Sequence, residues 1–197
     1  MRAEVEIAFI WWRERNGRDY EVIEAPRSSL SGKALLDEAP SSVQADRIVP
    51  KRKCLDSYQP LDDIPALWEQ FARIEKREDA IKFVRTFGPL GREGLRGKGD
   101  IIGNILREAD SMRRDTLGSI KLHARIDNGQ LRISPADFLD AIWLQYTKDK
   151  SEGRANRCPQ CRRIFAKGPD TGRRKDAIFC SVECKDKSKS LKRSRKS

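Results

Sequence analysis

The sequence predicts an α+β fold that is mainly α, with an N-terminal β-hairpin, a helical body and a small cysteine-containing module at the C-terminal end. Three observations support this prediction. Apolar residues alternate along the first segment, they recur at helical spacing between residues 64 and 146, and two close cysteine pairs follow residue 157. The expected domains are residues 1–153 for the body and residues 154–197 for the module, joined by a hinge at residues 151–153.

The N-terminal segment has the two-residue period of a β-strand. Asn16-Gly17 favours a tight turn, and Tyr20 to Ile23 can return as a second strand, which together predict the hairpin. Four prolines and two Ser-Ser pairs interrupt residues 26–60, so a long loop with short extended pieces is expected there. The apolar residues that share one face of the first strand are Val5, Ile7, Phe9 and Trp11.

Three apolar stripes with a period of 3.6 residues predict the first three helices of the body. The first begins near Asp62, the second ends at Gly88-Pro89, and the third covers about residues 100–122. Residues expected to face the core are Ile64, Leu67, Trp68, Phe71 and Ile74 in the first, Ala80, Ile81, Val84 and Phe87 in the second, and Ile101, Ile105, Ala109 and Met112 in the third.

A turn and a fourth helix complete the expected body. Asp127-Asn128-Gly129 predicts a tight turn between strands at residues 124–126 and 130–133. The segment from Ser134 to Asp137 has the pattern of a capping box with proline at the first helical position. The apolar face of the helix that it opens carries Phe138, Leu139, Ile142, Trp143 and Tyr146.

The C-terminal module contains four cysteines at the spacing of a metal site. Two residues separate Cys158 from Cys161, and three residues separate Cys180 from Cys184. Zinc prefers four soft donors in a tetrahedron, and each close pair presents two thiolates to one ion. The segment between the pairs is too short for an apolar core, so the ion would act as that core. Two disulfides, or buried free thiols, are the alternatives.

Several features favour one structural Zn²⁺ over those alternatives. No apolar signal segment precedes the alternating N-terminal pattern, which predicts a cytoplasmic protein whose thiols stay reduced. Four thiolates on one zinc ion leave no open position for water, so the site would be structural rather than catalytic. Cys54, the fifth cysteine, has no cysteine or histidine near it in the sequence and is expected to be an ordinary residue.

The expected architecture of the module is a treble clef. A turn at Cys158 and Cys161 would lead into a strand at residues 162–165, a turn at residues 168–172 and a returning strand at residues 175–179. Cys180 and Cys184 would lie at the start of a helix, whose positive end favours thiolates. A zinc ribbon, with the second pair on another turn, is the alternative.

All of the excess positive charge lies on this module. The chain has 41 Lys and Arg against 30 Asp and Glu, and residues 154–197 hold 15 of the former and 4 of the latter, which leaves 26 of each for the body. Such an asymmetry predicts binding to a polyanion, and we expect nucleic acid; a solvated, disordered tail is the alternative. The residues expected to contact phosphates are Arg162, Arg163, Arg173, Arg174, Lys175, Lys185, Lys189 and Lys192.

No catalytic set is evident in the sequence, so we do not expect an enzyme. His123 is the only histidine and is expected to be structural or at the surface. No nucleophile elbow, phosphate-binding loop or zinc-deaminase pattern is present. No apolar run is long enough to cross a membrane, so no membrane partner is expected.

The module resembles the CGNR-type zinc finger of bacteria. The residues that carry the resemblance are Arg157-Cys158-x-x-Cys161-x-x-x-Phe165, Gly172-Arg173-Arg174 and Phe179-Cys180-Ser181-x-x-Cys184. In that family the finger follows a helical region of the ABATE kind, to which the segment from Phe138 to Tyr146 is similar. The family's Cys-Gly-Asn-Arg is here Cys184-Lys185-Asp186-Lys187, so the roles of its last three positions do not carry over.

The resemblance implies a DNA-binding transcriptional regulator whose cysteines hold zinc. On this hypothesis the helical body senses a small effector or binds a protein partner. A protein-interaction adapter, in which the finger is purely structural and the basic tail meets an acidic protein surface, is the alternative. An enzyme with its site in the body is a third hypothesis, and it lacks a convergent acid, base and nucleophile.

Overall fold

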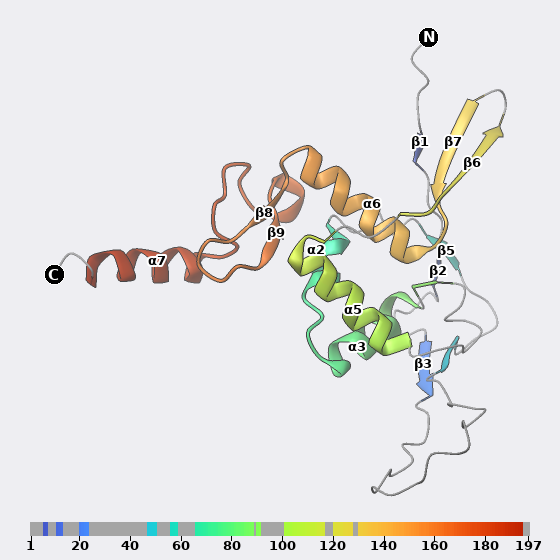
Figure 1. The fold of residues 1–197 in the computed structure, drawn as a ribbon, viewed down its shortest axis with the longest axis horizontal. Helices are drawn as coiled ribbons and strands as arrows, with labels where there is room; N and C mark the ends of the chain where they lie inside the picture. The colour runs from blue at the N-terminus through green and yellow to red at the C-terminus, as the bar shows by residue number, and fades with distance from the viewer. Residues whose placement is uncertain are drawn as a thin grey trace, which may run out of the picture.

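The computed structural model describes residues 66–88, 90–91, 101–116, 120–127 and 130–194, and five short strands nearer the N-terminus (Figure 1). Among these residues the fold is mixed α and β and mainly helical, as predicted. The helices are α2 (Leu67–Ala72), α3 (Arg77–Phe87), α5 (Ile101–Arg114), α6 (Phe138–Ser151) and α7 (Val182–Ser194), with a 3₁₀ helix η1 (Pro169–Thr171). The strands are β1 (Glu6–Ile7), β2 (Trp11–Arg13), β3 (Tyr20–Ile23), β4 (Arg47–Pro50), β5 (Asp56–Tyr58), β6 (Leu122–Asp127), β7 (Gln130–Pro135), β8 (Ala155–Arg157) and β9 (Ile164–Ala166).

Helices α2, α3, α5 and α6 enclose the core (Figure 1). Most residues of the predicted apolar stripes are buried, because a helical period places them on one face that can leave water together. Ile81 and Leu139 are partly buried, and Ile64 lies outside the described residues. Aromatic rings meet edge to face in this core, with the centroids of Trp68 and Tyr146 5.1 Å apart and those of Phe71 and Phe83 5.5 Å apart. The largest fully buried side chains of the four helices are Leu67, Trp68, Phe71, Val84, Ile102, Ile105, Met112, Phe138 and Ile142.

Helix α5 ends at Arg114, well before residue 122, where the sequence predicts its end. Asp115 takes a left-handed conformation, with a φ of 62°. The amide of Thr116 donates to the carbonyl of Ser111, and the amide of Asp115 donates to that of Met112. These two bonds form a Schellman motif, which closes the helix by satisfying its last carbonyl groups. The chain can then enter β6 at Leu122.

The predicted N-terminal hairpin is not confirmed. Strands occur at both expected places, but β3 pairs antiparallel with β4, and β2 pairs antiparallel with β5. Strand β1 pairs in parallel with β7. The alternating pattern identifies a half-buried strand without specifying its partner, and here each partner comes from a distant part of the sequence. The Asn16-Gly17 turn lies outside the described residues, as do most of residues 26–60.

The second predicted hairpin is confirmed. Strands β6 and β7 pair antiparallel, with Asp127 opposite Gln130, so two residues connect them. Helix α6 follows, and its first residue is Phe138, because the carboxylate of Asp137 accepts a hydrogen bond from the amide of Asp140. Ser134 and Pro135 belong to β7, so the helix begins later than the predicted capping box placed it.

Asp115 ties the end of α5 to α6, which leads to a pH prediction. Burial alone would raise the pKa of Asp115, but hydrogen bonds from Lys150, at 2.6 and 2.7 Å, and from the Tyr146 hydroxyl, at 2.6 Å, lower it below its usual value. A lowered pKa in the folded state stabilises the protein above the unfolded pKa, and this stabilisation disappears as the pH falls through the folded pKa. Asp115→Asn should therefore weaken the acid dependence of stability, measured by urea unfolding from pH 2.5 to 7.

The cysteine-containing module packs directly on the helical body. Ile164 and Ala166 of β9 belong to the same buried cluster as the apolar side chains of α2 and α6. Strand β9 contacts α2, and β8 contacts α6. Helix α6 extends through Ser151, and Gly153, with a φ of 68°, then turns the chain into β8. The division into domains at residue 153 stays a prediction.

Candidate metal centre

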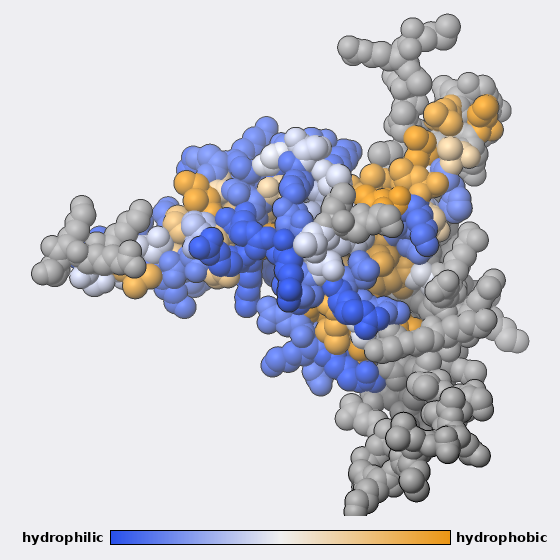
Figure 2. Space-filling model, viewed as in Figure 1, coloured by the Kyte–Doolittle hydropathy of each residue, from blue (hydrophilic) through white to orange (hydrophobic). Residues whose placement is uncertain are grey.

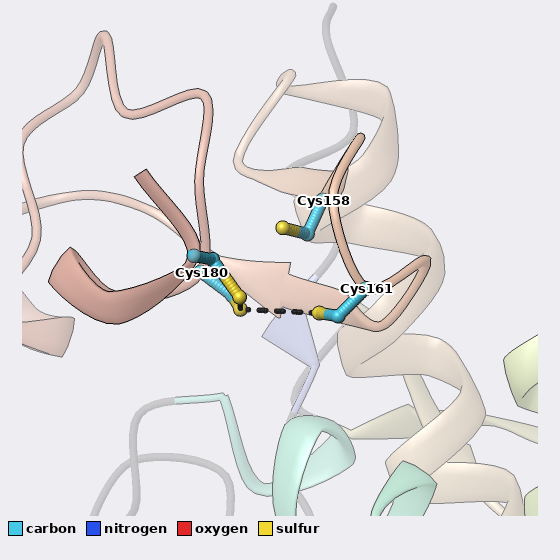
Figure 3. Close-up of side chains that lie close together, drawn as sticks. Cys158, Cys161 and Cys180 are labelled. Atoms are coloured by element: carbon cyan, nitrogen blue, oxygen red, sulfur yellow. Dashed lines mark hydrogen bonds between the residues drawn. The ribbon is translucent and has the colours of Figure 1, made fainter. Parts of the chain in front are cut away.

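Two structural elements bring the four cysteines together. Cys158 and Cys161 lie in the turn between β8 and β9, where Arg157 pairs with Ile164 and residues 158–163 reverse the chain. The amide of Arg162 donates to the carbonyl of Cys158 at 2.9 Å, and Arg162 takes a left-handed φ of 63°. Cys180 lies just before α7. Figure 3 shows that the turn with Cys158 and Cys161 lies opposite Cys180.

The helix start that carries the second pair is well defined. The hydroxyl of Ser181 accepts a hydrogen bond from the amide of Cys184 at 3.3 Å, which is the geometry of an N-cap. Cys184 then lies in the first turn of α7, one helical turn after Cys180. The second pair is thus carried by a helix, as in a treble clef, rather than by a second turn.

The sulfur atoms of all four cysteines lie within 4.8 Å of one another. The Sγ–Sγ distance is 3.4 Å between Cys161 and Cys180 and 3.6 Å between Cys180 and Cys184. A tetrahedral ion with metal–sulfur bonds of about 2.3 Å requires sulfur atoms roughly 3.8 Å apart. The four thiols are free rather than joined in disulfides, and in Figure 3 the labelled side chains point toward a common centre. The cluster can therefore hold a metal ion.

The surroundings of the sulfur atoms favour a bound cation. Burial raises the pKa of Cys158, but hydrogen bonds from the backbone amides of Cys180, Cys161 and Gln160 outweigh it and lower the pKa to about 6. Cys180 behaves in the opposite way, because burial and the adjacent thiols of Cys161 and Cys184 raise its pKa. Several thiolates can share this small volume only when a cation neutralises them.

The expected strands of the module are placed differently in the structure. The hairpin forms between β8, which precedes the first cysteine pair, and β9, which follows it. Residues 175–179 form no returning strand, and the connection before them contains η1 and a single bridge between Gly168 and Arg173. The first pair is thus held by its own flanking strands.

Glu69 is a residue of this region that the sequence analysis missed. It lies on α2, is 7% exposed, and accepts hydrogen bonds from the amide of Ala166 at 2.9 Å and from both terminal nitrogens of Arg173, at 2.8 and 3.0 Å. Glu69 and Arg173 are 104 positions apart in the sequence, so no local pattern connects them. A charged residue directly after Leu67 and Trp68, within an apolar stripe, was the only signal in the sequence.

Arg173 holds the metal centre against the body. Its Nε donates to the carbonyl of Cys180 at 3.1 Å, and one of its terminal nitrogens donates to the carbonyl of Ala166 at 2.9 Å. Its guanidinium carbon also lies 5.6 Å from the centre of the Phe165 ring. Arg173 was expected to contact phosphates, but in the structure its donors face Glu69 and these carbonyl groups.

The other residues expected to contact nucleic acid are at the surface, where described. Arg174 is exposed and forms a two-bond ion pair with Asp176, at 2.9 Å for each bond. The side chain of Lys192 lies outside the described residues. The remaining five are exposed, and no ion pair is found for them among the described residues: Arg162, Arg163, Lys175, Lys185 and Lys189.

The other candidate residues of the sequence analysis play no part in this centre. His123 is exposed on β6. Cys54 lies outside the described residues. No helix in the described part of the chain combines the length and the apolar character that crossing a membrane requires.

Comparisons of this chain with protein-family models, with curated proteins and with solved structures found no match. The resemblance to the CGNR-type finger therefore stays a prediction that rests on the cysteine motif and its neighbours.

Proposed function

We propose that this protein binds one zinc ion through Cys158, Cys161, Cys180 and Cys184 and uses the module built around that ion to bind nucleic acid. Four cysteine thiolates form the donor set that structural zinc prefers. Bound zinc would supply folding free energy to residues 167–184, where few apolar side chains are buried. The four ligands would complete its coordination, so the zinc would shape a binding surface and would not activate water.

The exposure of α7 is the observation that carries the nucleic-acid proposal. The helix projects away from the body (Figure 1), and none of its described side chains is buried. A helix of 13 residues without packing partners is marginal in water, and like charges one turn apart, such as Lys185 and Lys189, destabilise it further. Phosphate groups along this face would neutralise the lysines and stabilise the helix.

Among nucleic acids we propose DNA, and we propose that the chain is a cytoplasmic bacterial regulator of transcription. These finer statements rest on the resemblance of the cysteine motif to the CGNR-type finger. In this proposal the exposed cations around Lys175 and Lys185 contact phosphates and orient the module on the duplex. The helical body would carry the effector or protein partner.

Binding to DNA should fall steeply with salt. We expect log Kd of the zinc-loaded chain for a labelled 20-base-pair duplex to rise linearly with log[KCl], because bound lysines release counterions from phosphates. Lys185→Gln combined with Lys189→Gln should reduce the slope by about 2, if each lysine contacts one phosphate. Fluorescence anisotropy at 50, 100 and 200 mM KCl would measure both effects.

A charge-matched variant provides the control for this experiment. Lys82→Gln combined with Lys148→Gln removes two exposed lysines from α3 and α6 and should leave the salt slope unchanged. A zinc-loaded wild-type chain that binds neither DNA nor RNA in a salt-dependent way would contradict the proposed function. A slope that falls equally in both double variants would show that only the total charge matters.

A further inference from the structure

A cleft lies beside the metal centre, between the segment that leads to Cys180 and the start of α7. Its volume is about 360 Å³, and its lining is mostly apolar. Cavities of this size accommodate one or two side chains of a binding partner. The lining side chains that matter here are Ile178, Phe179 and Val182, with Arg174 and Lys185 at the edges.

The two aliphatic residues of this cleft are unusually open to solvent. Ile178 is 61% exposed and Val182 is 69% exposed. They lie four positions apart on either side of Cys180, and Arg174 and Lys185 line the same cleft. Small hydrophobic areas among hydrophilic ones are visible around the base of α7 in Figure 2. Adjacent exposed aliphatic side chains in a hollow are typical of a surface that binds a partner.

The charges around the cleft indicate which sign of charge a binding partner would carry. Asp176 is the one acidic residue of the lining, and the two-bond ion pair with Arg174 neutralises it. Lys185 lies on the same face of α7 as Val182, and Lys189 lies one turn further along. Neither lysine, nor the nearby Lys175, has an acidic partner among the residues that the structure describes. Carboxylates on an incoming segment would therefore find unpaired cations here.

The chemistry of the lining favours a peptide over an unstacked nucleic-acid base. A base needs a flat, open π surface, such as an exposed aromatic ring or a free guanidinium group. Phe179 is half-buried, and the guanidinium of Arg174 is held by two hydrogen bonds to the Asp176 carboxylate. Aliphatic walls instead suit side chains such as leucine, isoleucine or phenylalanine.

We propose that this cleft docks an acidic segment of a partner protein, whose large apolar side chains enter between Ile178 and Val182 while its carboxylates meet Lys185 and Lys189. This interaction surface shares Lys185 and Lys189 with the proposed DNA function, so peptide and DNA would compete for them, but the apolar cleft is argued independently of that function. Cys180 lies between the two aliphatic residues and is held by the other cysteines, so the cleft keeps its shape only while the metal centre is intact.

The test uses the full-length, zinc-loaded chain and a display library of random 12-residue peptides. Enriched peptides should combine Asp or Glu with Leu, Ile or Phe, and the best of them, made synthetically, should bind with a measurable Kd by fluorescence anisotropy. Ile178→Ser combined with Val182→Ser should weaken this binding at least tenfold, because exposed anchors in a cleft carry most of the affinity. Leu191→Ser, at a 51% exposed position further along α7, is the matched control and should have no effect.

Three results would overturn the proposal. The first is a library that yields no enriched peptides, or only neutral or basic ones. The second is an unchanged Kd in the Ile178→Ser, Val182→Ser variant, with one zinc per chain showing that the variant is folded. The third is a dT12 oligonucleotide that displaces the peptide and loses affinity in the same variant, which would assign the cleft to bases. If the chain bound the peptide but not duplex DNA, the result would contradict the proposed DNA function and leave the peptide proposal intact.

Discussion

Cys180→Ser should abolish metal binding and unfold the segment from residue 167 to the end of α7. The wild-type chain is expected to hold one zinc ion, and apparent binding free energies of structural zinc in small fingers are about 10–16 kcal/mol at neutral pH. The Cys180 sulfur lies 3.4 Å from that of Cys161 and 3.6 Å from that of Cys184, and its loss leaves three ligands without a closed site. Metal content per chain and amide hydrogen exchange would measure the two effects.

The fifth cysteine provides the control for this substitution. Cys54→Ser removes the cysteine that is not among the proposed ligands and should leave one zinc ion per chain and the exchange pattern of α7 unchanged. In Cys180→Ser the helices α2, α3, α5 and α6 should keep their protection, because their core is largely made of their own side chains. Equal zinc content in the wild-type chain and in Cys180→Ser would refute the assignment of the ligands.

Arg173→Met should destabilise the protein by about 1.5–3 kcal/mol, the range for lost hydrogen bonds to a charged group, because Glu69 keeps its ion pair with Arg73 and the hydrogen bond from the amide of Ala166. The Glu69 side chain is 9% exposed and that of Arg173 is 23% exposed, so water can only partly replace the lost bonds. The substitution also removes the donor to the Cys180 carbonyl, so zinc affinity should fall as well. Urea unfolding and competition with a zinc chelator would measure the two losses.

The neighbouring arginine is the matched control. Arg174 pairs with Asp176 at the surface, where their side chains are 85% and 70% exposed, so Arg174→Met should change stability by at most about 1 kcal/mol. A double-mutant cycle with Glu69→Gln isolates the coupling of Glu69 and Arg173. If Arg173→Met and Arg174→Met had the same small effect, the buried pair would not be holding the module in place.

The features that could be predicted from the sequence are those encoded by patterns over short stretches of the chain. The helical stripes and the Asn128-Gly129 hairpin are encoded within one or two turns of chain, and the cysteine pairs gather because each pair needs only a tight turn or a helix start. The end of α5 was missed because Asp115, a residue with a Cβ atom, adopts the left-handed conformation that glycine usually supplies.

The features that could not be predicted are contacts between distant segments. Strand β1 pairs with β7 across more than a hundred residues, whereas the Asn16-Gly17 signal is purely local. The same holds for Glu69, whose partners Ala166 and Arg173 lie in the cysteine-containing module. Such pairs follow from the packing of whole elements, and a single sequence contains no local pattern for them.

The core that β9 shares with α2 couples the orientation of the cysteine-containing module to that of the helical body. A finger on a flexible tether searches for its target independently of the domain that carries it, and its reach is set by the tether. Here the ion pair of Glu69 with Arg173 and the burial of Ile164 and Ala166 fasten the metal centre to the body. The direction of α7 is therefore set by the body. A partner bound to α7 would be held at a fixed angle to the helical body.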